Sequence, residues 1–295
     1  MDPFKMIAVL LLLSLSSACG EDLEGDTDGG DADSDADTDA DSDADSDADS
    51  DTDTDTDTDA DAGHITDQEP VPLGSSASFA ILASAEVANI PTSAITGDVG
   101  LTPDTGANIS GFSEPETCPE VTGIVYAVDA AGPACAQIDP VLLATAKTDA
   151  AAAFVDARAA ARGTPNSISG DLNGLTLYPG LYESGSSLEI SPGGLLYLDA
   201  QGDGSAVFII RSETSITTEA ASEVVLEGDA KAANVFWTAG SAVTLGTGSI
   251  MKGTLIAGTS ISLLTGAALE GRALNQGASA EAITLDSGTI TVPSP

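Results

Sequence analysis

The chain has 295 residues, and its 47 acidic residues against 8 basic ones give a net charge of −39. This charge excludes nucleic acid as a partner, because so few basic residues cannot neutralise a phosphate backbone. The chain also has three cysteines and a single histidine, His64, so it cannot build a cluster of histidine metal ligands. We therefore expect no metal and no cofactor, and we interpret His64 as a solvated linker residue.

The amino terminus has the pattern of an export signal. Its apolar run, residues 6–15, is too short to span a bilayer comfortably. The sequence "LSSAC", which ends at Cys19, resembles a bacterial lipoprotein box, although Ser16 stands where such a box usually has Leu or Val. We expect residues 1–18 to be a signal peptide and Cys19 to be the lipidated first residue of an exported protein. This protein would touch the outer membrane or cell surface only through its lipid; ordinary cleavage and secretion is the alternative.

Residues 19–72 form an acidic spacer in this interpretation. Every odd position from Asp31 to Asp61 is Asp, so the segment cannot bury apolar surface and its charges repel one another. We expect an extended, disordered tether. A specific calcium site is the alternative, but the glycines that fold calcium-binding loops do not occur between Asp31 and Asp61, and diffuse cation binding is favoured.

The compact domain is predicted to cover residues 73–295, and its second half decomposes into similar coils. Each coil has a short alternating strand, a turn of small residues and a second strand. The coils start at Ser186, Thr214, Ser241, Thr259 and Glu281, with spacings of 28, 27, 18 and 22 residues. Periods near 20 residues with up to three strands per turn indicate a β-solenoid. Residues 94–101 and 167–184 look like pieces of further coils.

Residues 139–163 break this pattern and predict one long helix. Apolar side chains recur at helical spacing there: Leu142, Leu143, Ala146, Ala150, Ala153, Phe154 and Ala157. Asp139–Pro140 is a start signal and Gly163 a stop signal. A single helix therefore interrupts two sets of coils.

Alternation along the strands predicts which side chains face inward. The first strands place one parity in the core: Leu188, Ile190, Ile216, Val243, Leu245, Ile261, Leu263, Ile283 and Leu285. The opposite parity is mostly Ser, Thr and Ala. The third strands, "AVFII" and "NVFW", are apolar on both parities, so we expect the helix to cover them.

Several motifs in the compact domain carry a resemblance to a known family. They are "LGSSASFAILASAEVAN", "SAITGDVGL", "VTGIVYAVDA", "LTLYPGLYES", "ANVFWTAGSAVTLGTGS", "GTLIAGTSISLLTGAALEGRAL" and "AITLDSGTITV". In this order they resemble the microbial ice-binding (ice-adhesin) domain over about residues 73–293. The resemblance implies an all-β fold with one long helix: a right-handed, discontinuous β-solenoid of triangular section. It also implies adsorption to ice through a flat face, without catalysis or cofactor.

Two surfaces are candidates for ice contact. The first is the outward side of the first strands: Ser215, Thr217, Ala242, Thr244, Ser260, Ser262, Ala282 and Thr284. A rigid core fixes the spacing of these short side chains, which can then order water in a lattice-like pattern. The rival surface covers the turns and second strands: Thr247, Ser249, Thr265, Ser287 and Thr289. Some family members carry a Thr–Gly–X–Thr/Asn pattern on the ice face, and "TGSI" (247–250) and "TGAA" (265–268) match only its first half.

Enzyme chemistry finds little support. Asp98 and Asp171, which end the similar steps "ITGD" and "ISGD", are the repeated acidic signature, and we interpret both as turn formers rather than as catalytic carboxylates that face each other across a cleft. A serine nucleophile has no nearby histidine to activate it. The alternative function is a stalked adhesin or matrix-binding module without ice activity, for which we would expect exposed aromatic residues.

Cys118 and Cys135 are predicted to form a disulfide, since they flank a short segment before the helix and an exported protein tolerates this bond. Two buried free thiols are the alternative. We expect the protein to be a monomer.

Overall fold

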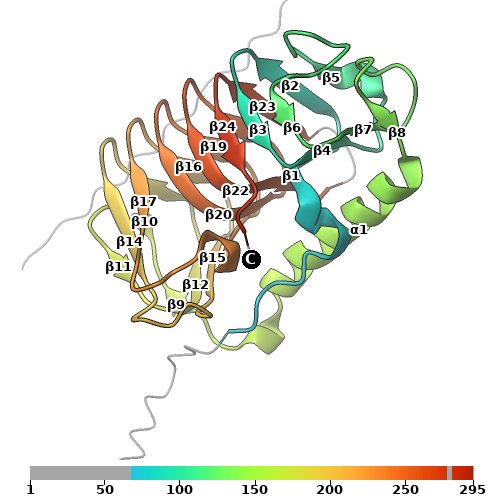
Figure 1. The fold of residues 1–295 in the computed structure, drawn as a ribbon. Coiled ribbons are helices and arrows are strands. Elements are labelled where there is room, and N and C mark those ends of the chain that lie inside the picture. The colour runs from blue at the N-terminus through green and yellow to red at the C-terminus, as the bar shows by residue number, and fades with distance from the viewer. Residues whose placement is uncertain (1–67, 278–280, 295) are drawn as a thin grey trace, which may run out of the picture. The chain divides into compact units, whose positions relative to one another are not determined.

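The computed structural model describes residues 68–277 and 281–294, which belong to one compact unit, Thr58–Pro295. The predicted signal peptide, Cys19 and the Asp repeat lie outside the described residues. Within them, parallel strands stack into coils with three faces, and one helix runs along one side (Figure 1). We call these the first-strand face, the second-strand face and the helix-covered face.

The first-strand face is an eight-stranded parallel sheet. Its strands, in spatial order, are β10 (Gly170–Asp171), β13 (Leu188–Ile190), β16 (Ile216–Thr218), β19 (Val243–Leu245), β21 (Ile261–Leu263), β23 (Ala282–Asp286), β2 (Glu86–Ile90) and β5 (Ile109–Ser110). The amino-terminal strand β2 thus pairs with the carboxy-terminal strand β23. The solenoid is therefore discontinuous in sequence, as the resemblance implied.

The second-strand face contains shorter pieces of a second, 16-stranded sheet. Its strands are β11 (Thr176–Leu177), β14 (Leu195–Asp199), β17 (Glu223–Glu227), the first halves of β20 (Ile250–Ala257) and β22 (Ala268–Asn275), β24 (Thr289–Thr291), β3 (Ala94–Thr96) and β6 (Val121–Thr122). Strands β20 and β22 continue around a corner onto the third face. Glycine is required there, since Gly253 has φ +107° and a Cβ on Gly271 would lie 1.8 Å from the Gly253 carbonyl oxygen.

The helix-covered face completes the triangle. Its strands are β9 (Asn166–Ser167), β12 (Gly180–Ser184), β15 (Phe208–Ser212), β18 (Val235–Ala239), the second halves of β20 and β22, β1 (Phe79–Ala83), β4 (Asp98–Leu101), β7 (Val125–Ala127) and β8 (Gln137–Ile138). Short 3₁₀ helices η1 (Gly74–Ser78), η2 (Gly106–Asn108), η3 (Ala160–Arg162) and η4 (Ala232–Asn234) connect the coils. All residues of β15 and β18 are buried, as their two-sided apolar pattern predicts.

Helix α1 (Pro140–Ala157) covers this face with its predicted apolar stripe. Ala153 and Ala157 pack with Ile209 and Phe236, while Leu143 and other stripe residues pack around Phe79. Asp139 caps the first turn by accepting a hydrogen bond from the Leu142 amide at 2.9 Å. The predicted end at Gly163 is wrong, because Ala159 is extended and only a separate 3₁₀ turn follows it.

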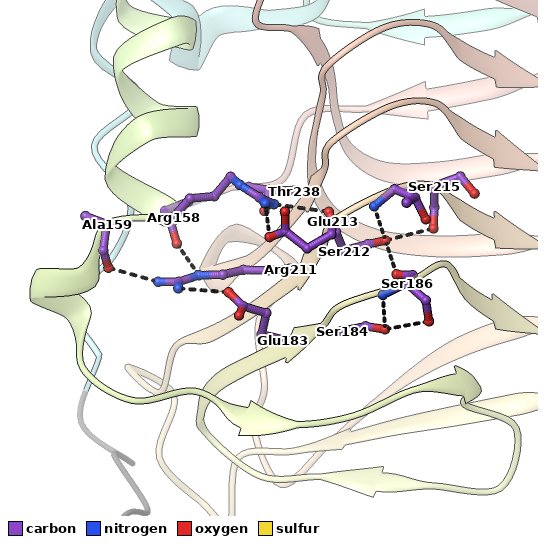
Figure 2. A network of polar contacts seen from close by, with 12 residues as sticks. Arg158, Ala159, Glu183, Ser184, Ser186, Arg211, Ser212, Glu213, Ser215 and Thr238 are labelled. Carbon is purple, nitrogen blue, oxygen red and sulfur yellow. Dashed lines mark hydrogen bonds and ion pairs between the residues drawn. The ribbon is translucent and has the colours of Figure 1, made fainter.

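A buried arginine explains why the helix stops early. Arg211 lies on β15, is 3 % exposed, and donates a hydrogen bond to the carbonyl of Ala157 at 2.6 Å. It also donates to the carbonyl of Ala159 at 3.3 Å (Figure 2). Arg158 reaches back from the helix end to the Ser212 carbonyl (3.1 Å) and pairs with Glu213. The carbonyl of Ala157, the last residue of the helix, is therefore satisfied by the sheet rather than by another helical turn.

The compact region extends to residues before the predicted start at Leu73. Val71 is 3 % exposed and packs with Ala153 and Ala157 of the helix. Gln68 donates a hydrogen bond to the Arg162 carbonyl at 3.2 Å. The described chain thus begins beside the carboxy-terminal end of α1.

The predicted disulfide is confirmed. Cys118 and Cys135 are bonded, with Cα atoms 5.9 Å apart, and the two cysteines are 17 positions apart in sequence. The bond closes the loop that carries β6 and β7. In the chain-entropy account, a loop of this size gains about 3 kcal/mol.

Candidate functional site

The inward residues of the first-strand face form two rows of almost fully buried side chains. Ile216, Val243, Ile261 and Ile283 are in register and at most 3 % exposed. The second inward row, Leu245, Leu263 and Leu285, is equally buried. The alternation predicted from sequence is confirmed, and the outward residues between these rows are fixed by a packed core.

The candidate residues on the first-strand face lie together as predicted. Thr217, Thr244, Ser262 and Thr284 occupy one row of neighbouring strands. The second row lies two residues earlier along the chain in each coil and contains Ser215, Ala242, Ser260 and Ala282. All eight side chains are half-buried, so neighbouring rows shield one another and none projects far from the sheet.

Neighbouring hydroxyl groups also restrain one another. Thr284 Oγ1 donates a hydrogen bond to Ser262 Oγ at 3.1 Å. At the corner that precedes β16, Ser212 Oγ donates to the carbonyls of Ser186 (2.8 Å) and Ser215 (3.0 Å), and these serines are visible at the right of Figure 2. These hydrogen bonds fix the corner from which β16 enters the first-strand face.

The array is longer than the sequence indicated. Strands β2 and β5 extend the Thr217 row with Ala88 and Ser110. Sequence analysis did not predict Ala88 and Ser110 as part of the array. Their strands join it through the pairing of β2 with β23, in which Glu86 and Ala282 are 196 positions apart, and no local pattern indicates such a pairing. The outer limits of the array carry charge: Glu189 is exposed on β13 and Glu86 is exposed on β2.

The rival surface is only partly as predicted. Thr247, Thr265 and Thr289 are exposed, and Ser287 is half-buried at a turn with φ 50°. Ser249 does not belong to this surface: it is fully buried and accepts a hydrogen bond from Thr218 Oγ1 at 3.0 Å. Corner residues do not follow strand alternation, which is why its outward placement was wrong.

The second-strand face differs from the first in shape and charge. Lys252 Nζ and Glu270 Oε2 form an ion pair at 2.7 Å in its centre. A hollow beside the pair is lined by Ile250, Lys252, Ala268, Leu269, Glu270, Thr289 and Thr291. This face is therefore neither flat nor uncharged at its centre.

One end of the second-strand face is rich in threonine. Thr291, Thr96 and Thr122 lie in one outward row on β24, β3 and β6, next to Thr289 and Ala94. Three of these threonines were not predicted as site residues, although the alternation in "TIT" (289–291) and "AIT" (94–96) could have indicated two of them. They form a smaller array than the first-strand face does.

The two acids considered for catalysis both hold turns. Asp98 Oδ1 accepts a hydrogen bond from the Ile124 amide at 3.0 Å. Asp171 accepts bonds from the amides of Asn173 and Ser191, and the first of these is the main cause that lowers its pKa. The acids lie on β4 and β10, which belong to different sheets, so they do not face each other across a cleft.

Two general properties of the described region bear on function. Among residues 68–277 and 281–294, no group of three or more His, Cys, Asp or Glu side chains could hold a metal ion. Within the same residues, no helix has the length and hydropathy needed to cross a membrane.

Comparison with known proteins gives one consistent family. The model of the ice-binding-like family matches residues 81–291. An ice-binding protein of Flavobacterium frigoris is 38 % identical over 226 residues, which cover 76 % of each chain.

Solved structures agree with this match. The crystal structure of an ice-binding protein from an Antarctic biological consortium superposes with a TM-score of 0.66 at 39 % identity, covering 79 % of this chain and 95 % of the other. An ice-binding protein from an Arctic yeast, whose structure is described as the basis of its antifreeze activity, gives a TM-score of 0.67 at 31 % identity, with 77 % and 97 % covered. The β-solenoid fold is thereby confirmed, and the chain belongs to the ice-binding-like family.

Proposed function

We propose that this protein binds ice and that its first-strand face is the contact surface. Membership of a family whose relatives are named ice-binding proteins supports the function. The observation that carries the choice of face is the array of eight half-buried Ser, Thr and Ala side chains on four consecutive strands.

The physical argument concerns water that is ordered before contact. Neighbouring strands are about 4.8 Å apart, and outward side chains along one strand are about 6.5–7 Å apart. Short side chains on this grid lose little conformational entropy when they meet a solid surface. Their methyl and hydroxyl groups can hold water in a repeated pattern that merges with the ice lattice, whereas mobile charged side chains would hold their own hydration shells.

The second-strand face is the weaker candidate for the same reason. The Lys252–Glu270 ion pair and the hollow beside it interrupt the centre of that face. Its threonine-rich end, around Thr291 and Thr96, is the region that would make contact if ice bound there.

The ice activity and the face are tested together. The purified protein should partition into a growing ice front and shape single ice crystals in a nanolitre osmometer. Thr244→Tyr should remove most of this activity, by about tenfold or more, because a ring in the middle of the array holds neighbouring rows away from the lattice. Thr289→Tyr is the matched control on the second-strand face and should change the activity by less than about twofold.

Two results would contradict the proposal in different ways. If Thr244→Tyr keeps full activity and Thr289→Tyr loses it, ice binds the second-strand face. If the unmodified protein neither shapes ice nor enters it, the function as an ice binder fails and the alternative of a stalked adhesin takes its place.

We also propose that the mature chain is exported and held at the cell surface by a lipid on Cys19. The support is the sequence "LSSAC" followed by the acidic spacer. The described chain begins at Gln68, beside the carboxy-terminal end of α1.

The anchor has its own test. Cys19→Ala should shift the protein from the membrane fraction to the soluble fraction, or stop its maturation, in a bacterial host that lipidates such boxes. Unchanged membrane partition of this variant would contradict lipidation and favour another mode of attachment.

A further inference from the structure

The hollow on the second-strand face has an apolar floor. Ile250, Ala268 and Thr289 are in register on β20, β22 and β24, which lie side by side in Figure 1. Ala268 is the shortest of the three side chains, so the surface sinks between its neighbours. Leu269 contributes to the same lining, and the exposed area within the hollow is mostly apolar.

Charged and hydroxyl groups border this floor. Lys252 and Glu270 pair at 2.7 Å, and their side chains are 23 % and 45 % exposed. An ammonium group has three donors and a carboxylate has about four acceptor sites, so one mutual bond leaves most of this capacity free for a ligand. The Thr291 hydroxyl lies in the same row and adds a group that both donates and accepts.

The core holds the lysine backbone in place. Trp237 is fully buried and its Nε1 donates a hydrogen bond to the Lys252 carbonyl at 2.8 Å. The next residue, Gly253, turns the strand around the corner. A ligand in the hollow would therefore meet a backbone that is already fixed, which lowers the cost of binding.

Two tyrosines lie further along the same face: Tyr197 is half-buried and Tyr178 is exposed. Tyr197 on β14 pairs with Val225 on β17, and Glu223 on β17 pairs with Ile250, so Tyr197 lies in the same outward row as Lys252, two strands away. At about 4.8 Å per strand the separation is about 10 Å. Tyr178 is 41 % exposed. It lies two positions after Thr176, the β11 residue that pairs with Tyr197. These rings offer apolar faces with polar edges beyond the hollow.

We propose that the second-strand face binds a neutral polysaccharide chain laid across the strands, with one sugar ring over Ala268 and another against Tyr197. A pyranose ring has an apolar C–H face and a rim of hydroxyl groups, which matches an apolar floor bordered by donors and acceptors. Its length is close to the strand spacing of about 4.8 Å, so successive sugars follow successive coils.

The charge of the face selects against other polymers. Glu223 and Glu270 repel anionic chains, and residues 71–295 carry 23 acidic and 7 basic residues, a net charge of −16. Lys252 at the border of the hollow opposes a cationic chain. Ice is a poor partner for this region, since the hollow, the tyrosines and the ion pair destroy flatness.

The proposal is tested by affinity gel electrophoresis of the full chain in gels that contain hydroxyethyl cellulose, soluble β-1,3-glucan or dextran. At least one of these neutral polymers should retard the protein, whereas polygalacturonate, the anionic comparison, should not. Ala268→Tyr fills the hollow and should raise the dissociation constant about tenfold or more. Lys252→Met and Tyr197→Ala, which change half-buried surface groups without filling the hollow, should each raise it severalfold.

Thr244→Tyr on the first-strand face is the control and should leave the dissociation constant within about twofold. Absence of retardation by all three neutral polymers overturns the proposal. Retardation that Ala268→Tyr, Lys252→Met and Tyr197→Ala all leave unchanged also overturns it, as does equal retardation by polygalacturonate. Ice adsorption is measured separately on the same samples, so a failure of glycan binding is distinguishable from a failure of the ice-binding function.

Discussion

The first-strand and second-strand faces are built by the same coils on the same core, yet their surfaces differ. At neighbouring positions on consecutive strands, the first-strand face carries Thr244 beside Ser262, and the second-strand face carries Lys252 beside Glu270. Both pairs rest on inward rows that are almost fully buried, such as Leu263 below one and Leu269 below the other. The fold thus sets the spacing of both faces and leaves the chemistry of each to its outward residues.

The shared core gives the largest expected effect. Leu263 is 1 % exposed and lies in the cluster that supports both faces. Leu263→Ala should lower the free energy of unfolding by about 2–5 kcal/mol, through lost apolar contact and the cavity left behind. Thermal unfolding measures the loss. Because the two faces share this core, a variant that lost the order of one face and kept that of the other, seen by hydrogen exchange, would contradict their dependence on a common support.

A rise in pH above about 8 should act on the contact between the helix and the sheet. Lys147 extends from α1 and donates a hydrogen bond to the Asn275 carbonyl, and its burial lowers its pKa to about 8, against a smaller opposing effect of Glu281. Burial likewise raises the pKa of Glu281. For a lysine with a lowered pKa, the stabilising contribution is complete above its ordinary pKa of 10.5 and is lost as the pH falls through about 8.

Stability should therefore rise with pH above about 8, by up to roughly 3 kcal/mol over the whole range, since one pKa unit corresponds to about 1.4 kcal/mol. Chemical unfolding between about pH 8 and 9.5 tests the rise below the range in which tyrosines ionise. Lys147→Met should flatten it. A slope of equal size in this variant would show that another group is responsible.

The sequence predicted the common scaffold better than the surfaces. Alternation in short strands identified the inward residues from Leu188 to Leu285, because each of these positions faces a core that rejects polar groups. The same argument placed Thr244 and Ser262 outside. The helix was found from its apolar stripe, but its end was not, since the carbonyl of Ala157 is bonded by Arg211, which lies 54 residues away on β15.

The errors occur where local periodicity stops. Ser249 occupies a corner, and its hydroxyl points into the core toward Thr218, which no strand pattern indicates. The contribution of Ala88 to the first-strand face depends on β2 stacking against the last coil. Long-range pairing of this kind depends on the whole solenoid. Outward positions that are assigned only from alternation within each strand therefore underestimate the number of strands in the array.

The smallest expected change in stability comes from exchanging the chemistry of the two faces. Thr244 and Ser262 are neighbours in register on β19 and β21, as Lys252 and Glu270 are on β20 and β22. The double variant Thr244→Lys/Ser262→Glu transfers the ion pair to the first-strand face. Exposed ion pairs contribute between about 0 and 1 kcal/mol, so the unfolding temperature should change little. Ice adsorption should nevertheless fall about tenfold or more, because two long, strongly hydrated side chains replace short ones at the centre of the array.

The reverse exchange, Lys252→Thr/Glu270→Ser, should leave ice adsorption within about twofold, since the hollow at Ala268 still interrupts that face. A large gain from the reverse exchange, together with no loss from the first, would show that the second-strand face is the one that meets ice.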